Sequence, residues 1–109
     1  MSASNLYGVI GNPIFHSKSP LIYNALFKAA HSDARCIRIH LDKCSEVKML
    51  FRGLNLQGIN VTSPFKEEII SYLDVIDTNA RQIQAVNTVI KKNEKLFGYN
   101  TDFLGVIKS

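Results

Sequence analysis

Short apolar runs alternate along this chain with stretches in which apolar residues recur at helical spacing. Short runs predict strands, and a repeat at i, i+3 and i+4 predicts amphipathic helices. This alternation is typical of an α/β domain, in which helices cover a sheet. We therefore predict strands at 6–10, 35–41 and 58–61, helices at 20–30, 45–54, 64–73 and 78–83, and a hairpin of 85–91 and 95–99.

Length and composition narrow the class of protein. The chain has 109 residues, which suits one domain, and 46% hydrophobic with 20% charged residues is typical of a soluble globular protein. The net charge is +4, but the sequence has no dense basic cluster, so we expect no nucleic-acid binding. The positive charge would suit an anionic small molecule as well as it suits a nucleic acid. Because no apolar run has the length of a signal peptide or a membrane span, we expect no membrane partner and a cytoplasmic location.

The two cysteines, Cys36 and Cys44, have no partners at metal-ligand spacing, so no metal site is expected. A disulfide between them stays open, and reduced thiols are the simpler expectation.

A pair of serines precedes the predicted helix at 20–30. Ser19 followed by Pro20 is typical of a helix N-cap and the first helical position. Ser17 is not needed for that cap. Two hydroxyls beside the free amides of a helix start could hold a carboxylate, and an ordinary loop serine is the equally weighted alternative.

Lys66 has an unusual place in the third predicted helix. Ser63 or Thr62 would cap this helix and Pro64 would begin it, so Lys66 would fall in the first turn. A cation there faces the positive end of the helix dipole. Lys66 therefore either points into solvent or is a positioned ammonium for proton transfer, with desolvation and the dipole favouring its neutral form.

Asn60 and Asn87 both interrupt runs that favour strands, in which asparagine is depleted. A buried amide needs hydrogen-bond partners. Asn87 therefore either ties down a neighbouring loop, which is the slightly favoured alternative, or binds a hydroxyl of a ligand.

A last helix is predicted to begin near Thr101, capped by Asn100 or Thr101, and Asp102 would be stabilising in its first turn. Capping alone explains this stretch, although a carboxylate at Asp102 could also hold the Lys66 ammonium. All of these polar stretches lie near the ends of predicted strands, where open α/β sheets bind ligands. The glycines form neither a G-x-G-x-x-G fingerprint nor a P-loop, so no dinucleotide site is expected within the chain.

Four stretches that contain these residues occur in a fixed order: GVIGNPIFHSKSP, GINVTSPFKEE, AVNTV and GYNTDFLG. Together they resemble the shikimate dehydrogenase family, specifically its N-terminal substrate-binding domain, over nearly the whole chain. The resemblance implies a three-layer αβα sandwich with a mainly parallel sheet and an antiparallel strand. It also implies that residues 1–101 are the substrate-binding, catalytic domain, and that 102–109 are the truncated start of the helix linking it to a Rossmann domain.

The resemblance further implies roles for individual residues. Ser17 and Ser19 would hold the carboxylate of shikimate, and Thr62, Asn87 and Asp102 would contact its ring hydroxyls. Lys66 would be the catalytic lysine, with Asp102 as its partner. In the family these residues support the reversible reduction of 3-dehydroshikimate to shikimate with NADPH, a step of chorismate and aromatic amino acid biosynthesis. A lysine suits this reaction because reduction of a ketone requires a proton for the developing alkoxide.

The chain departs from the family pattern in three ways. Gln84 stands where the family commonly has glycine, and Ser63 where it often has an aliphatic residue, but neither is an assigned functional position. The third departure is length: NADP would be bound by a domain that is missing here, so we expect the fragment alone to be inactive. Three alternatives stay open: a quinate/shikimate dehydrogenase paralogue, a non-enzymatic ligand-binding module, and a homodimer that pairs through an edge strand such as 35–41.

Overall fold

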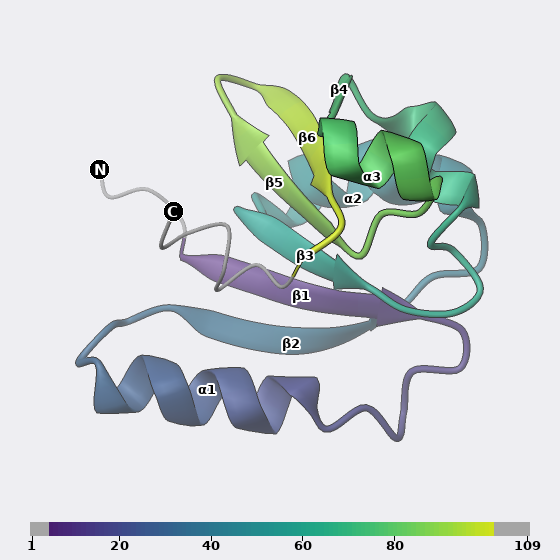
Figure 1. The fold of residues 1–109 in the computed structure, drawn as a ribbon. Helices are drawn as coiled ribbons and strands as arrows, with labels where there is room; N and C mark the ends of the chain where they lie inside the picture. The colour runs from purple at the N-terminus through teal and green to yellow at the C-terminus, as the bar shows by residue number, and fades with distance from the viewer. Residues whose placement is uncertain (1–4, 102–109) are drawn as a thin grey trace.

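The computed structural model describes residues 5–101, which form one mixed six-stranded sheet with helices on both faces (Figure 1). The strand order is β2-β1-β3-β5-β6-β4. β1 runs parallel to β2 and to β3, β5 runs antiparallel to β3 and β6, and β4 is parallel to β6. The strands are β1 (Leu6–Gly11), β2 (Arg35–His40), β3 (Gly58–Val61), β4 (Val75–Ile76), β5 (Thr88–Lys92) and β6 (Lys95–Tyr99). The predicted α/β fold, mainly parallel with antiparallel pairing, is confirmed.

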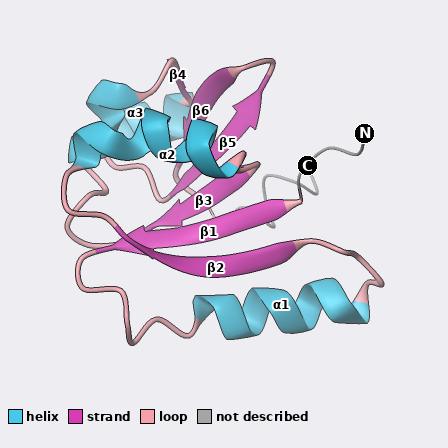
Figure 2. Ribbon diagram, turned by 180° about the vertical axis from the view of Figure 1, so that it is seen from behind, coloured by secondary structure: helices cyan, strands magenta, loops and turns pink. Residues whose placement is uncertain are grey.

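Three α-helices and two 3-10 segments connect the strands. They are α1 (Ser19–Ala29), α2 (Val47–Leu54), α3 (Thr78–Ile83), η1 (Cys44–Glu46) and η2 (Glu68–Tyr72). In Figure 2, α1 runs beside the β1–β2 end of the sheet, and α2 and α3 lie toward the other end. Within residues 5–101, no helix combines the length and apolar character needed to cross a membrane.

The core has two layers because successive side chains of a strand point to opposite faces of a sheet. Val9 packs with Tyr23 and Phe27 of α1, whereas its neighbour Ile10 packs with Phe51 of α2. The helix predicted at 20–30 is therefore confirmed. The sequence places the apolar residues Leu21, Ile22, Ala25, Leu26 and Ala29 at helical spacing, but these residues do not form the buried face. Tyr23 and Phe27 are buried, and the apolar side chains left exposed on α1 are Leu21, Ile22 and Leu26.

The α-helix predicted at 64–73 is wrong. A continuous helix would need the Lys66 carbonyl oxygen to accept the amide of Ile70. That oxygen instead accepts the amide of Val86 across the structure at 2.8 Å. The Ile70 amide turns to the Glu67 carbonyl at 3.3 Å, which is 3-10 geometry, and only the η2 segment forms. Lys66 thus lies in a turn, and the helix-dipole argument for it does not apply.

Both cysteines are free and buried, and they lie in different core layers. Cys36 packs in the layer that contains α1, and Cys44 in the layer that contains α2, so the sheet separates the two thiols. Burial raises the pKa of the Cys36 thiol to about 11, although nearby Arg38 partly offsets the rise. Burial also raises the pKa of the Cys44 thiol to about 11, with a further contribution from Glu68.

The thiolate is the nucleophile in thiol reactions, and burial with a raised pKa keeps both thiols protonated in the folded chain. We therefore expect the native chain to react slowly with Ellman's reagent near neutral pH. In denaturant, both cysteines are expected to react fast. Since the folded pKa lies above the ordinary 9.0, the stability that depends on neutral thiols is complete below pH 9.0 and is lost as pH rises through about 11. Rapid modification of the native chain, followed by absorbance, would contradict the buried placement of the thiols.

Candidate functional site

The carboxyl ends of β1 and β3 lie side by side because the two strands are parallel neighbours. The Thr62 amide donates to the Ile10 carbonyl at 2.9 Å, and the Asn12 amide donates to the Ser63 carbonyl at 3.2 Å. The loop that leads from β1 to α1 and the turn that follows β3 therefore start at the same edge of the sheet.

The start of β5 and the end of β6 reach this edge from the other side, since β5 runs antiparallel to both β3 and β6. The Val61 amide donates to the Asn87 carbonyl at 2.8 Å, and the Asn87 amide donates to the Tyr99 carbonyl at 3.0 Å. The Lys66 carbonyl, bonded to the Val86 amide, brings the turn after β3 to the same place. The structure thus gathers the predicted segments around Thr62, Lys66 and Asn87, and the β1–α1 loop, at one edge.

The serine segment differs locally from its prediction. Ser19 is the first residue of α1 and not its cap; Lys18 occupies the cap position without a side-chain hydrogen bond. The Ser17 hydroxyl oxygen accepts the Ser19 amide at 3.3 Å, so Ser17 satisfies one of the free amides at the helix start. The Arg38 Nε donates to the Ser17 carbonyl at 2.8 Å and ties this loop to β2.

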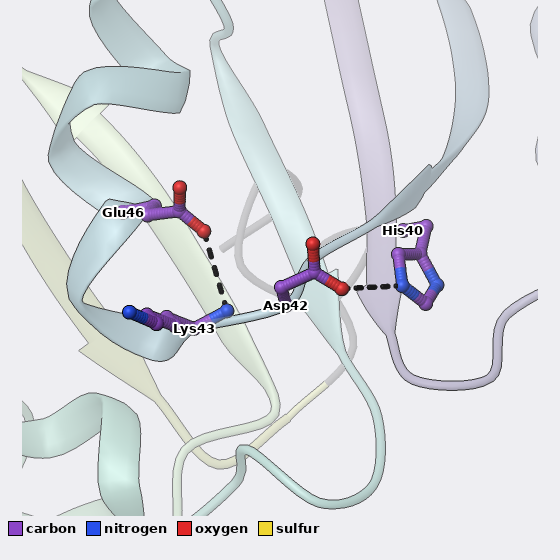
Figure 3. Close-up of polar contacts among 4 residues, drawn as sticks. All are labelled: His40, Asp42, Lys43 and Glu46. Carbon is purple, nitrogen blue, oxygen red and sulfur yellow. Dashed lines mark hydrogen bonds and ion pairs between the residues drawn. The ribbon is translucent and has the colours of Figure 1, made fainter.

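Ring stacking and polar contacts hold the end of β2 beside the same loop. The Phe15 ring stacks on the His40 ring, with centroids 6.0 Å apart and planes inclined by 11°. The His40 Nε2 lies 2.9 Å from Asp42 Oδ1, and the Lys43 amide donates to Glu46 Oε1 at 3.2 Å (Figure 3). The carboxylates of Asp42 and Glu46, which follow β2, therefore both bind groups within a few residues of themselves in the sequence.

Thr62 is half-buried and points back toward β1. Its hydroxyl donates to the Ile10 carbonyl at 2.8 Å, so the alternative of a helix cap at Thr62 is not what the structure shows. The hydroxyl proton is used in this bond, and the oxygen keeps its capacity to accept a hydrogen bond from a ligand.

The Lys66 side chain is exposed, and it lines a surface hollow together with Ser63, Pro64, Glu67 and Glu68. Among the residues that the structure describes, no carboxylate forms an ion pair with its ammonium. Asp102, the predicted partner, lies outside the described residues. The backbone of Lys66 therefore lies at the predicted site, where the hydrogen bond from the Val86 amide holds it.

Asn87 carries an unpaired polar atom. Its Oδ1 is buried and has no hydrogen-bond partner within residues 5–101. A buried acceptor without a donor costs about 1–3 kcal/mol, so each such atom requires an explanation. A hydroxyl donated by a ligand would provide one, and the alternative role of Asn87, tying down a neighbouring loop, is fulfilled by its backbone and not by this oxygen.

Sequence reasoning missed three residues that support this edge: Arg38, Tyr23 and Thr88. Tyr23 accepts a hydrogen bond from Asn60 Nδ2 at 2.7 Å, and Thr88 donates to Asn60 Oδ1 at 3.2 Å. The asparagine inside a strand was the one available signal, since Tyr23 reads as a core residue and threonine is common in strands.

Comparisons with known proteins agree with this geometry. The family model described as the shikimate dehydrogenase substrate binding domain matches residues 9–89. The NADP(+) shikimate dehydrogenase of Aquifex aeolicus is 48% identical in an alignment that covers 97% of this chain and 40% of that protein. The chain thus spans about two fifths of the length of this curated relative.

Two solved structures show the same fold. A shikimate 5-dehydrogenase from Listeria monocytogenes, in complex with shikimate and NAD, has a TM-score of 0.82 at 34% identity, covering 99% of this chain and 38% of its own. A 5-ketofructose reductase of Gluconobacter has a TM-score of 0.83 at 32% identity, covering 96% and 40%. The residues matched by the family model make up most of the chain and include the end of β1, all of β3 and the turn with Lys66, so this chain belongs to the family of shikimate dehydrogenase substrate-binding domains.

Proposed function

We propose that this chain is the substrate-binding half of an NADP-dependent shikimate dehydrogenase, with residues 1–101 as that domain and 102–109 as the start of the linking helix. One observation carries the proposal. In a member of this family, the segments of Ser17, Thr62, Lys66 and Asn87 converge on the carboxyl edge of β1 and β3. That edge is where open α/β sheets bind ligands.

The proposed ligand contacts follow from the hydrogen-bonding capacity that the site side chains leave unused. Ser17 and Ser19 hold the carboxylate of shikimate with their hydroxyls, beside the positive end of the α1 dipole. The buried, unpaired Oδ1 of Asn87 accepts a ring hydroxyl, and the Thr62 oxygen accepts a second one. Asp102 is proposed as a further ring contact and as the partner of Lys66.

Lys66 supplies the acid–base chemistry in this proposal. NADPH supplies the hydride when it is bound. We propose that it is bound by the part of the relatives' length that this chain does not span. As the ketone of 3-dehydroshikimate is reduced, the ammonium of Lys66 donates a proton from Nζ to the developing alkoxide, and Asp102 holds the ammonium in place. The step belongs to chorismate and aromatic amino acid biosynthesis, and we propose the cytoplasm as its location.

A steady-state assay of NADPH formation from shikimate and NADP tests this function. The chain alone is expected to give no turnover above background, because nothing brings a nicotinamide to the substrate. The same chain joined to the remaining residues of the Aquifex aeolicus relative is expected to give saturable turnover. Turnover by the chain alone, or its absence in a well-folded joined protein that binds NADP, would contradict the proposal.

The same assay separates the alternatives. Preference for quinate would identify a quinate/shikimate paralogue, and the likeness to a 5-ketofructose reductase makes that ketone a third substrate to include. A chain that binds shikimate and yet never supports turnover would be a non-enzymatic binding module.

A homodimer through the edge strand β2, where Ile37 is exposed, stays a separate proposal that sedimentation would test.

A further inference from the structure

A short chain of buried hydrogen bonds lies beneath the candidate site. Asn60 Nδ2 donates to the Tyr23 hydroxyl at 2.7 Å, and the Thr88 hydroxyl donates to Asn60 Oδ1 at 3.2 Å. The single proton of the Thr88 hydroxyl is shared between Asn60 Oδ1 and a second acceptor, the Thr101 carbonyl oxygen. Tyr23, Asn60 and Thr88 are 8%, 9% and 0% exposed, so these bonds form away from water.

Each residue in this series of hydrogen bonds lies next to a different segment of the site. Tyr23 is on α1, one turn after Ser19, and residues at i and i+4 share a helix face. Asn60 is on β3, two residues before Thr62.

The other two groups, Thr88 and the Thr101 carbonyl, approach from the opposite side. Thr88 is the first residue of β5 and follows Asn87, and Thr101 follows β6. The bonds therefore join α1, β3, β5 and the segment that follows β6, which approach the site from different directions.

Directional bonds do here what apolar packing cannot. Apolar contacts are non-directional, so aliphatic packing alone specifies the relative positions of elements less uniquely than directional bonds do. A hydrogen bond fixes its donor–acceptor distance within a few tenths of an ångström. An asparagine at the centre of a strand, where it is disfavoured, is also the kind of broken local rule that accompanies function.

We propose that Tyr23, Asn60 and Thr88 form a positioning triad that sets the distances between the carboxylate-binding start of α1 and the hydroxyl-binding ends of β3 and β5. The triad contacts no substrate; it acts through Ser17, Ser19, Thr62 and Asn87. The inference rests on the proposed function for its ligand, shikimate, but the geometry that it describes exists in the ligand-free chain. A shift of about 1 Å in such groups is enough to change binding strongly.

The decisive substitution is Thr88→Val, which keeps the shape of the side chain and removes its hydroxyl. We expect shikimate to bind about tenfold more weakly to this variant in an NMR titration. In the ligand-free protein, the amide signals of Ser17, Ser19 and Thr62 are expected to move, although all three lie outside β5. Thr88→Ser restores the hydroxyl and is expected to return the affinity to within about twofold of the original.

Two further variants guard against a trivial loss of stability. Val47→Ala removes buried volume on α2, in the opposite core layer, and is expected to lower the melting temperature without changing the affinity. Tyr23→Phe removes one hydroxyl at the far end of the triad and is expected to weaken binding in the same direction as Thr88→Val, which decides the matter if the Thr88 variant does not fold.

Unchanged affinity and unmoved signals at Ser17, Ser19 and Thr62 in folded Thr88→Val would overturn the triad. If the original chain binds no shikimate, the proposed function fails instead, and the ligand-free signals still decide the triad: movement confined to β5 and its direct neighbours would refute it.

Discussion

Lys66→Ala is expected to lower the turnover number of the joined, two-domain protein by about 10²–10⁴-fold, the usual contribution of a general acid. The Michaelis constant for shikimate is expected to change much less, since the ammonium acts mainly on the alkoxide that develops in the transition state. The Lys66 side chain is exposed and its backbone is held by Val86, so removing the side chain should leave the fold intact.

Lys95→Ala is the matched control. Lys95 is also an exposed lysine, but it begins β6 at the opposite edge, where the hairpin turns. Its replacement should leave turnover unchanged. A Lys66→Ala protein with undiminished turnover would show that Lys66 has no chemical role, and the function would then depend on binding groups alone.

Gly11→Ala is expected to have the largest combined effect on stability and binding. A Cβ at this position would overlap Thr62 Oγ1 and would lie 3.1 Å from Ile14 Cδ1 and 3.3 Å from the Ser63 carbonyl oxygen. Thr62 cannot move without losing its bond to the Ile10 carbonyl. Overpacking of this kind typically costs about 1–3 kcal/mol in the free energy of unfolding. Because Thr62 is a proposed ligand contact, shikimate affinity should also fall by about tenfold or more.

Gly53→Ala tests whether the effect belongs to the site. Gly53 lies in α2, and a Cβ there would meet nothing within 4 Å. Alanine inside a helix is expected to raise the free energy of unfolding by about 0.5–1 kcal/mol, with shikimate affinity unchanged. Denaturant unfolding and titration of both variants give the comparison. Equal effects of the two substitutions would mean that Gly11 is not held against Thr62 as the structure shows.

The strands could be predicted because their signals are local. The apolar run at 58–61 became β3, and the hairpin formed around Asn93 and Glu94, both of which adopt positive φ. The convergence of the segments could be predicted from a general rule of α/β folds, since parallel neighbouring strands place their carboxyl ends together.

The errors have long-range causes. The helix at 64–73 fails because the Lys66 carbonyl binds Val86, twenty residues away in the sequence. The buried face of α1 is set by Tyr23, whose partner Asn60 lies on β3. Local propensity contains neither contact. Lys66 is therefore not a cation at a helix start. Its proposed role depends on family membership and on the hydrogen bond from the Val86 amide to its carbonyl, which places Lys66 beside Asn87.

The most direct test of the account is a titration of the isotope-labelled chain with shikimate, followed by NMR. Saturable shifts are expected at Ser17, Ser19, Thr62, Lys66 and Asn87, with no change at Lys95 on the opposite edge. Shikimate methyl ester, which lacks the carboxylate charge, should bind more weakly and lose its effect first at the serines. The absence of saturable shifts, or shifts confined to the hairpin edge, would contradict a shikimate site at the carboxyl ends of β1 and β3.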